Sequence, residues 1–191
     1  GLIAYVAVPI AVMLVLLSHE FVFVVFGEKW VGVEIIIMIM GIRFGFGWLV
    51  GLNSTVFTAI GRPDLNSKLL IVITSFTLPI YFLSAGQGIL FFLYARLGTS
   101  LLDNLGNYLV AKKYLKINLK MYFKILKLPL LSGFGMCVTV MLFQQIIDGY
   151  SIYSLVLSFI IGVSTYLALS LIIDKEYFKW SFNYFVSIIK K

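Results

Sequence analysis

Long apolar runs dominate this chain. Segments of about 20 apolar residues recur along its 191 residues, and a helix needs about this length to cross roughly 30 Å of hydrocarbon. Hydrophobic residues make up 61% of the chain and charged residues only 12%, whereas soluble domains have about 25% charged residues. Water therefore cannot be its main solvent. We predict an all-α integral membrane protein.

The runs predict about six transmembrane helices. They cover residues 2–17, 33–60, 68–84, 89–111, 128–147 and 152–173. We expect a kink at Pro9 in the first helix and a break at Pro79 in the third, because proline removes a backbone hydrogen bond. Residues 21–26 are too few to cross alone, so we expect them in or near the outer interface. The second run exceeds the bilayer thickness and must tilt or begin in the interface.

Two segments have an amphipathic pattern. Between residues 112 and 127, lysines at 112, 116, 120 and 124 lie opposite an apolar face of Leu115, Leu119, Tyr122 and Leu126. This pattern predicts a helix that lies in the membrane interface. Residues 174–191 repeat it. The chain therefore divides into four spans (1–111), a cytoplasmic basic segment (112–127), a terminal helix pair (128–173) and a cytoplasmic tail (174–191).

The basic residues lie in alternate loops. Arg62, Lys68, the six lysines of 112–127 and those after 174 share one side, whereas Lys29 lies on the other. Because cytoplasmic loops are enriched in Lys and Arg, we expect both ends of the chain in the cytoplasm. The net charge of +7 is then explained by topology and by attraction to anionic membrane lipids. It requires no nucleic-acid partner.

Three ionisable residues, Arg43, Arg96 and Asp103, fall at membrane depth, where such groups usually face a bundle interior or an aqueous cavity. Within residues 89–111, Arg96, Ser100, Asp103 and Asn107 form one polar stripe, about 60° wide on a helical wheel. In one interpretation, neighbouring helices satisfy these groups structurally. In the other, Arg96 and the stripe contact an anionic substrate, and Asp103 binds a coupling proton or cation.

The helix predicted over 33–60 has a ridge of small residues. The ridge contains Arg43, Gly47, Gly51, Thr55 and Ala59, beside a second pair, Gly41 and Gly45. Small residues let helices approach closely, so the glycines indicate packing. Packing does not require the charge of Arg43, although its side chain could also extend to the interface. Asn53 could face a lumen or form an interhelical hydrogen bond. Ser154, Ser158 and Gly162 indicate packing of the last helix.

Neither a metal site nor a catalytic site is predicted. His19 and Cys137 are the single histidine and single cysteine, so no cluster of metal ligands is present. The acidic residues are scattered, and there is no motif of a nucleophile beside a base. We therefore expect a protein that is not an enzyme and needs no cofactor.

Four features together resemble the Wzx-type oligosaccharide flippases, of the superfamily that also contains multidrug and toxin extruders. They are an apolar helix with Pro9 that ends in residues 26–30 (FGEKW), a long helix that closes on residues 59–64 (AIGRPD), Gly86 and Gly88 at the next outer turn, and a lysine-rich segment before a final helix pair. Each motif is short, and the resemblance depends on their order and spacing over the whole chain.

The resemblance implies a function and a two-lobe architecture. Such proteins have about 12 to 14 spans in two repeated lobes, so we expect this chain to be part of a longer protein and to form most of its C-terminal lobe. It would translocate an isoprenoid-lipid-linked oligosaccharide across the inner (cytoplasmic) membrane by alternating access, with substrate contacts from Arg43, Asn53, Arg96, Ser100 and Asn107. Asp103 would couple transport to a proton or sodium ion.

Two alternatives remain. A multidrug exporter of the same superfamily would favour an acidic or aromatic cavity for cations. The arginines at membrane depth argue against this alternative. A membrane-embedded polymerase or acyltransferase would require a catalytic constellation and usually a large outer loop, and neither is visible in these residues.

Overall fold

The computed structural model describes residues 2–50, 53–116, 118–147 and 149–173, and within them it is all helical, without strands. The α-helices are α1 (Leu2–Leu16), α2 (Ser18–Phe21), α3 (Glu34–Val50), α4 (Asn53–Ala59), α5 (Asp64–Ala85), α6 (Ile89–Leu115), α7 (Leu119–Ile146) and α8 (Ile152–Ile173). A π-helix, Val22–Phe26, and a 3-10 helix, Glu28–Trp30, follow α2. The predicted helical class is confirmed for this part of the chain.

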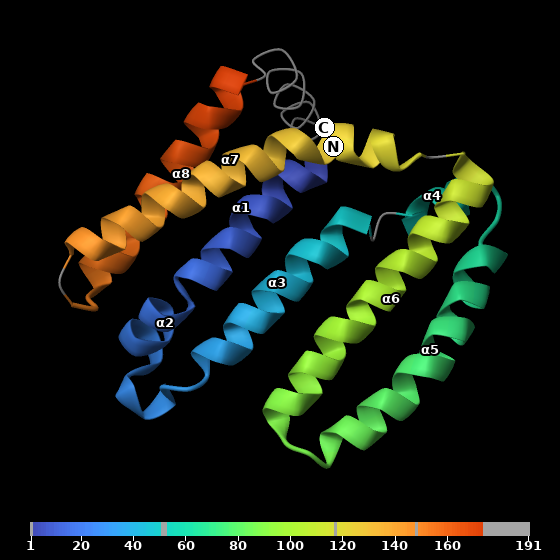
Figure 1. Cartoon of the computed structure of the whole chain (residues 1–191), viewed down its shortest axis with the longest axis horizontal. Coiled ribbons are helices and arrows are strands. Elements are labelled where there is room, and N and C mark those ends of the chain that lie inside the picture. The colour runs from blue at the N-terminus through green and yellow to red at the C-terminus, as the bar shows by residue number, and fades with distance from the viewer. Residues whose placement is uncertain (1, 51–52, 117, 148, 174–191) are drawn as a thin grey trace, which may run out of the picture.

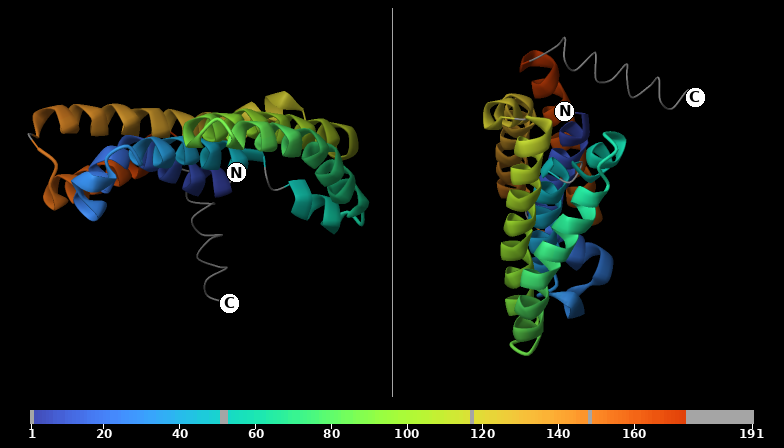
Figure 2. Two further views of the ribbon diagram at one scale, coloured as in Figure 1. Left: turned by 90° about the horizontal axis from the view of Figure 1, so that it is seen from below. Right: turned by 90° about the vertical axis from the view of Figure 1, so that its right-hand side faces the viewer.

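The long helices lie side by side in a broad curved layer (Figures 1 and 2). In space the order is α5, α6, α3 and α1, and then the α7–α8 hairpin, which packs on α1. One core joins α1, α7 and α8 around Met13, Met136, Val140 and Tyr166. A second, smaller core joins α4, α5 and α6 around Phe57, Leu65 and Ala111. Helix α3 connects the two parts, because it contacts both α1 and α6.

The turns alternate between two sides of the layer (Figure 1). Helix α2, the α5–α6 turn and the α7–α8 turn lie along the lower left of the view. The α4–α5 and α6–α7 turns lie at the upper right, and they bring Arg62, Lys68 and Lys112–Lys116 to one end of the layer. The chain therefore runs back and forth in the order that the sequence predicted.

Among the described residues, three helices are long and apolar enough to cross a membrane: α5, α7 from Phe123 onward, and α8. Residues 3–16 and 18–26 would make a fourth span, bent by 68°. Helix α3 has only 17 described residues before the gap at 51–52, and α6 has Arg96 and Asp103 within its length. Six spans therefore remain a prediction.

Proline does not interrupt the helices where the sequence indicated. Helix α1 continues through Pro9, and α5 continues through Pro79 from Asp64 to Ala85, so the predicted break at Pro79 is wrong. The first span changes direction at Leu17, between α1 and α2, and the kink at Pro9 stays a prediction. Transmembrane helices tolerate proline when local adjustments satisfy the freed carbonyl.

Two other segments differ from the sequence prediction. The run 33–60 contains two helices, α3 and α4, on either side of residues 51–52. The basic segment 112–127 is also divided, because Lys112 to Leu115 end α6 and a new helix begins at Leu119. Lys116, with φ of 53°, adopts the left-handed conformation that commonly ends a helix. No separate interfacial helix forms in the described part of 112–127, and the tail 174–191 lies outside the described residues.

Small and hydroxyl-bearing residues are buried beside the two apolar cores, and many large apolar side chains are exposed. Ser132 and Ser170 join α7 to α8 through a buried hydrogen bond of 3.1 Å between their Oγ atoms. Ser154, Ser158 and Gly162 are buried on the inner face of α8, as the sequence predicted. By contrast, Phe82 is 81% exposed and Ile172 78% exposed. This distribution is typical of helices that pack in lipid.

The glycine pair on α3 packs against α1. A Cβ atom at Gly41 would lie 2.8 Å from the Cβ of Leu14, and one at Gly45 would lie 2.9 Å from the Cβ of Ala11. The two backbones can approach this closely only because both positions lack a side chain. The predicted packing role of this pair is confirmed. The packing predicted for Gly47 is wrong, because nothing lies within 4 Å of its Cβ position.

Candidate functional site

The predicted charged residues meet where α3 packs against α6. Arg43 on α3 lies within electrostatic range of Asp103 on α6, although no ion pair within 4.0 Å is described between them. Both side chains are half-buried. The Nε atom of Arg43 and the Oδ1 atom of Asp103 are buried and have no hydrogen-bond partner. The interface thus holds two opposite charges that attract each other without forming an ion pair.

The side chain of Arg96 on α6 contacts α5. Its guanidinium carbon is 5.8 Å from the ring centroid of Tyr81 on α5 and 5.9 Å from that of Phe92. These are cation–π distances. The two rings also contact each other, with centroids 5.6 Å apart. Arg96 therefore has aromatic neighbours, and its buried Nε has no hydrogen-bond partner.

The remaining predicted residues do not form one cluster with the arginines. Ser100 is buried and donates a hydrogen bond to the Leu97 carbonyl oxygen (2.7 Å). The Nδ2 of Asn107 donates to the Asp103 carbonyl oxygen (2.9 Å). Asn53 begins α4, but its side chain lies outside the described part of the structure. The polar stripe is thus divided between an α3 side, with Asp103, and an α5 side, with Arg96.

Two contacts were not predicted. Asn104 donates from Nδ2 to the carbonyl oxygen of Phe46 on α3 (3.4 Å), beside the Arg43–Asp103 pair. The hydroxyl groups of Tyr81 and Thr99 lie 2.8 Å apart and join α5 to α6. Asn104 follows Asp103 in the sequence but lies about 100° from it on the wheel, so the stripe did not indicate the first contact. No sequence signal indicated Tyr81 as a neighbour of Arg96.

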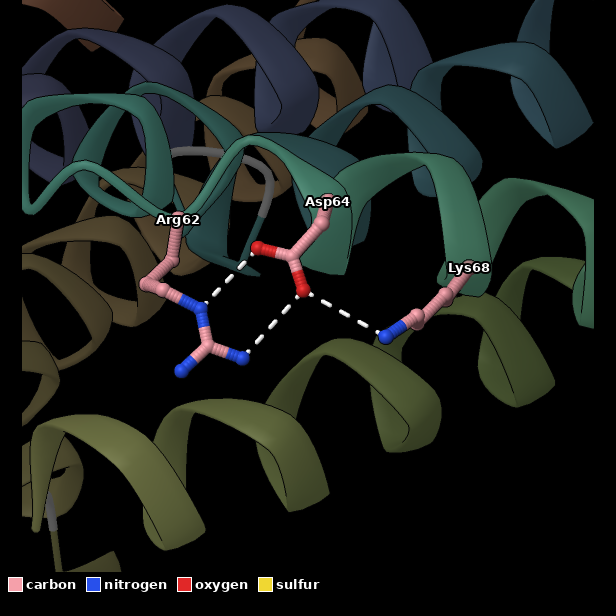
Figure 3. Close-up of polar contacts among 3 residues, drawn as sticks. All are labelled: Arg62, Asp64 and Lys68. Carbon is pink, nitrogen blue, oxygen red and sulfur yellow. Dashed lines mark hydrogen bonds and ion pairs between the residues drawn. The ribbon is translucent and has the colours of Figure 1, made fainter.

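A second charged group lies at the end of the layer where α5 begins (Figure 3). Asp64 accepts hydrogen bonds from the Nε and Nη2 atoms of Arg62, at 3.0 and 3.2 Å, and from Lys68 Nζ at 3.4 Å. The hydrogen bond to Asp64, and then its negative charge, raise the pKa of Arg62. Arg62 also lies over the ring of Tyr114 on α6, 5.2 Å from its centroid. These contacts connect the α4–α5 turn to the end of α6.

Two of the cavities are apolar. One, of about 280 Å³, lies between α1, α3 and α7, where Ala11, Gly45 and Cys137 line it. The other, of about 370 Å³, lies between α1, α2, α3 and α8. A third, of about 420 Å³, is polar and lies where α2 meets the α7–α8 turn. None of these three is lined by Arg43, Arg96 or Asp103.

Comparisons with family models, with curated proteins and with solved structures gave no significant match.

Proposed function

We propose that this chain forms most of one lobe of a two-lobe membrane transporter that moves an isoprenoid-lipid-linked oligosaccharide from the cytoplasmic to the outer leaflet. The observation that supports it most is the arrangement of Arg43, Asp103 and Arg96 within a layer of otherwise apolar helices. Charged groups at such positions are costly, and in membrane proteins they mark substrate or ion pathways.

The distribution of side chains supports a membrane location. Large apolar residues such as Phe82 and Ile172 are exposed, and several serines are buried. The basic residues of the α4–α5 and α6–α7 turns lie at one end of the layer, as the enrichment of positive charge in cytoplasmic loops would require. In our proposal this end faces the cytoplasm.

The open layer supports a partner lobe. The helices form a curved layer rather than a closed bundle (Figure 2), so a second lobe could face it and enclose a cavity, as in transporters built from repeats. Arg43 and Arg96 would then contact the pyrophosphate or acidic sugars of the substrate, because guanidinium groups bind such oxygens bidentately.

The proposal is tested in cells that lack the gene for this chain and in cells that are complemented with it. We expect deletion to abolish surface polysaccharide and to trap complete lipid-linked oligosaccharide in the cytoplasmic leaflet. The wild-type chain in its native protein should restore export, and an Arg43→Ala, Arg96→Ala double variant of equal abundance should not.

The alternative functions give different results in the same experiment. Loss of a polymerase would leave single oligosaccharide units on the cell surface, and loss of an acyltransferase would leave polysaccharide without acyl groups. Loss of a multidrug exporter would change sensitivity to cationic drugs and leave the polysaccharide intact. Any of these results would contradict the flippase proposal.

A further inference from the structure

The polar cavity lies at the end of the layer opposite the basic turns, between α2 and the α7–α8 turn (Figure 1). Its volume of about 420 Å³ is within the usual range of small-molecule sites, about 300–1,000 Å³. His19, Glu20, Gln144, Gln145 and Tyr150 are its polar and aromatic lining residues. The cavity is therefore large enough for an organic molecule, and its lining differs from that of the two apolar cavities.

Glu20 is the most informative of these residues. It is only 5% exposed, although the chain turns from α1 into α2 just before it. Its Oε1 atom accepts a hydrogen bond from Gln144 Nε2 at 3.0 Å. Its Oε2 atom is buried and has no hydrogen-bond partner. In its ionised form this carboxylate only accepts hydrogen bonds, so that form would be completed by a donor.

In its ionised form, Glu20 also has no ion-pair partner among the described residues. The described ion pairs of the chain join His19 to Glu34, Arg62 to Asp64 and Lys68 to Asp64, and none includes Glu20. Burial of an unpaired charge is strongly unfavourable. The ligand that completes this site should therefore be positively charged as well as a hydrogen-bond donor.

Aromatic rings form the wall beside Glu20. The ring of Tyr150 lies edge-on to that of His19, with centroids 4.7 Å apart, and 5.4 Å from that of Phe23. Aromatic faces attract organic cations. Within the described residues no group of three or more His, Cys, Asp or Glu side chains could hold a metal ion, so a transition metal does not fit these residues.

From this combination we propose that the cavity binds the primary ammonium group of a small organic molecule. The ammonium group would lie beside the Glu20 carboxylate, donate a hydrogen bond to it and neutralise its charge, while Tyr150 covers the adjoining carbon atoms. The ammonium could belong to a soluble amine or to the ethanolamine headgroup of a lipid. This inference does not depend on the flippase proposal.

The test measures thermal unfolding of the detergent-solubilised protein, by tryptophan fluorescence, with ethanolamine hydrochloride as the probe. A ligand that binds only the folded state raises the melting temperature. We expect a saturable rise with ethanolamine, and no such rise with sodium chloride or tetramethylammonium chloride at the same pH and ionic strength. Both control cations are positively charged, but neither sodium nor tetramethylammonium has an N–H group that could donate a hydrogen bond.

Two variants show whether the effect arises at Glu20. Glu20→Gln keeps the shape and removes the charge, so it should abolish the ethanolamine shift. Glu28→Gln, at an exposed acidic residue, is the matched control and should keep it. If Glu20→Gln does not fold, Tyr150→Leu provides a second variant, because this half-exposed residue should tolerate the change. The Tyr150→Leu substitution should weaken ethanolamine binding severalfold.

Nanodiscs distinguish the two sources of the ammonium group. If a lipid headgroup occupies the site, phosphatidylethanolamine should raise the melting temperature above that in phosphatidylcholine and suppress the ethanolamine shift. If the natural ligand is a soluble amine, the shift should be equal in both lipids. An equal shift with sodium chloride, a shift that persists in Glu20→Gln, or no shift in the wild type would each overturn the proposal.

Discussion

The guanidinium carbon of Arg96 lies 5.8 Å from the ring centroid of Tyr81, on the neighbouring helix. The sequence left two roles open for Arg96, a structural one and one in a cavity. Its guanidinium lies beside two aromatic rings that contact each other. These contacts add to the packing in either role, and their effect on stability can be measured.

Arg96→Ala should therefore lower stability by about 0.5–2 kcal/mol, the usual range of a cation–π contact. Arg96→Lys should retain part of the stability, because it keeps the charge. The measurement is thermal or denaturant unfolding in detergent, together with Tyr81→Leu and the double variant. If Arg96→Ala unfolds like the wild type, the contact does not stabilise the fold.

Arg43 and Asp103 should be energetically coupled, because the positive charge of Arg43 acts on the Asp103 carboxylate. We expect Arg43→Gln and Asp103→Asn to destabilise the protein singly, and the double variant to lose less than the sum. Coupling energies of neighbouring residues are typically about 0.5–3 kcal/mol. A double-mutant cycle in unfolding experiments measures this coupling, and strictly additive losses would show that the charges act independently.

Gly45→Ala should destabilise the α1–α3 contact, by about 1–3 kcal/mol. Its new methyl group would lie 2.9 Å from the Cβ of Ala11, and neither atom can move without its backbone. Gly47→Ala is the matched control on the same helix, because nothing lies within 4 Å of its Cβ position. Alanine favours helix over glycine by about 1 kcal/mol, so the control should be neutral or stabilising. Equal melting temperatures for the two variants would contradict the close packing.

The two ends of the layer should lie on opposite sides of the membrane. In a Cys137→Ala background, cysteines at Gln87 and Ser151 should react with an impermeant maleimide added outside intact cells. A cysteine at Lys113 should react only after the cells are opened. All three positions are exposed, so reactivity reports location rather than burial. Labelling of the Lys113 position from outside would contradict the proposed topology.

Local features of the sequence were enough to predict most of the helices and turns. Long apolar runs determine helices, because backbone groups in an apolar medium must form hydrogen bonds within their own segment. The turns at residues 61–63 and 86–88 were located by glycine and proline. The packing roles of Gly41, Gly45 and Gly162 were also predicted from the sequence, because small residues at helical spacing let neighbouring helices approach closely.

The tertiary structure alone decided which neighbour each polar residue has. The helical wheel placed Arg96 and Asp103 on one stripe, but α5 packs near the first and α3 near the second, so the stripe is divided between two interfaces. Glu20 on α2 is buried, and its hydrogen-bond partner is Gln144 on α7, 124 residues further along the chain. Sequence periodicity determines which residues share one face of a helix. Packing between distant segments determines which neighbours cover that face.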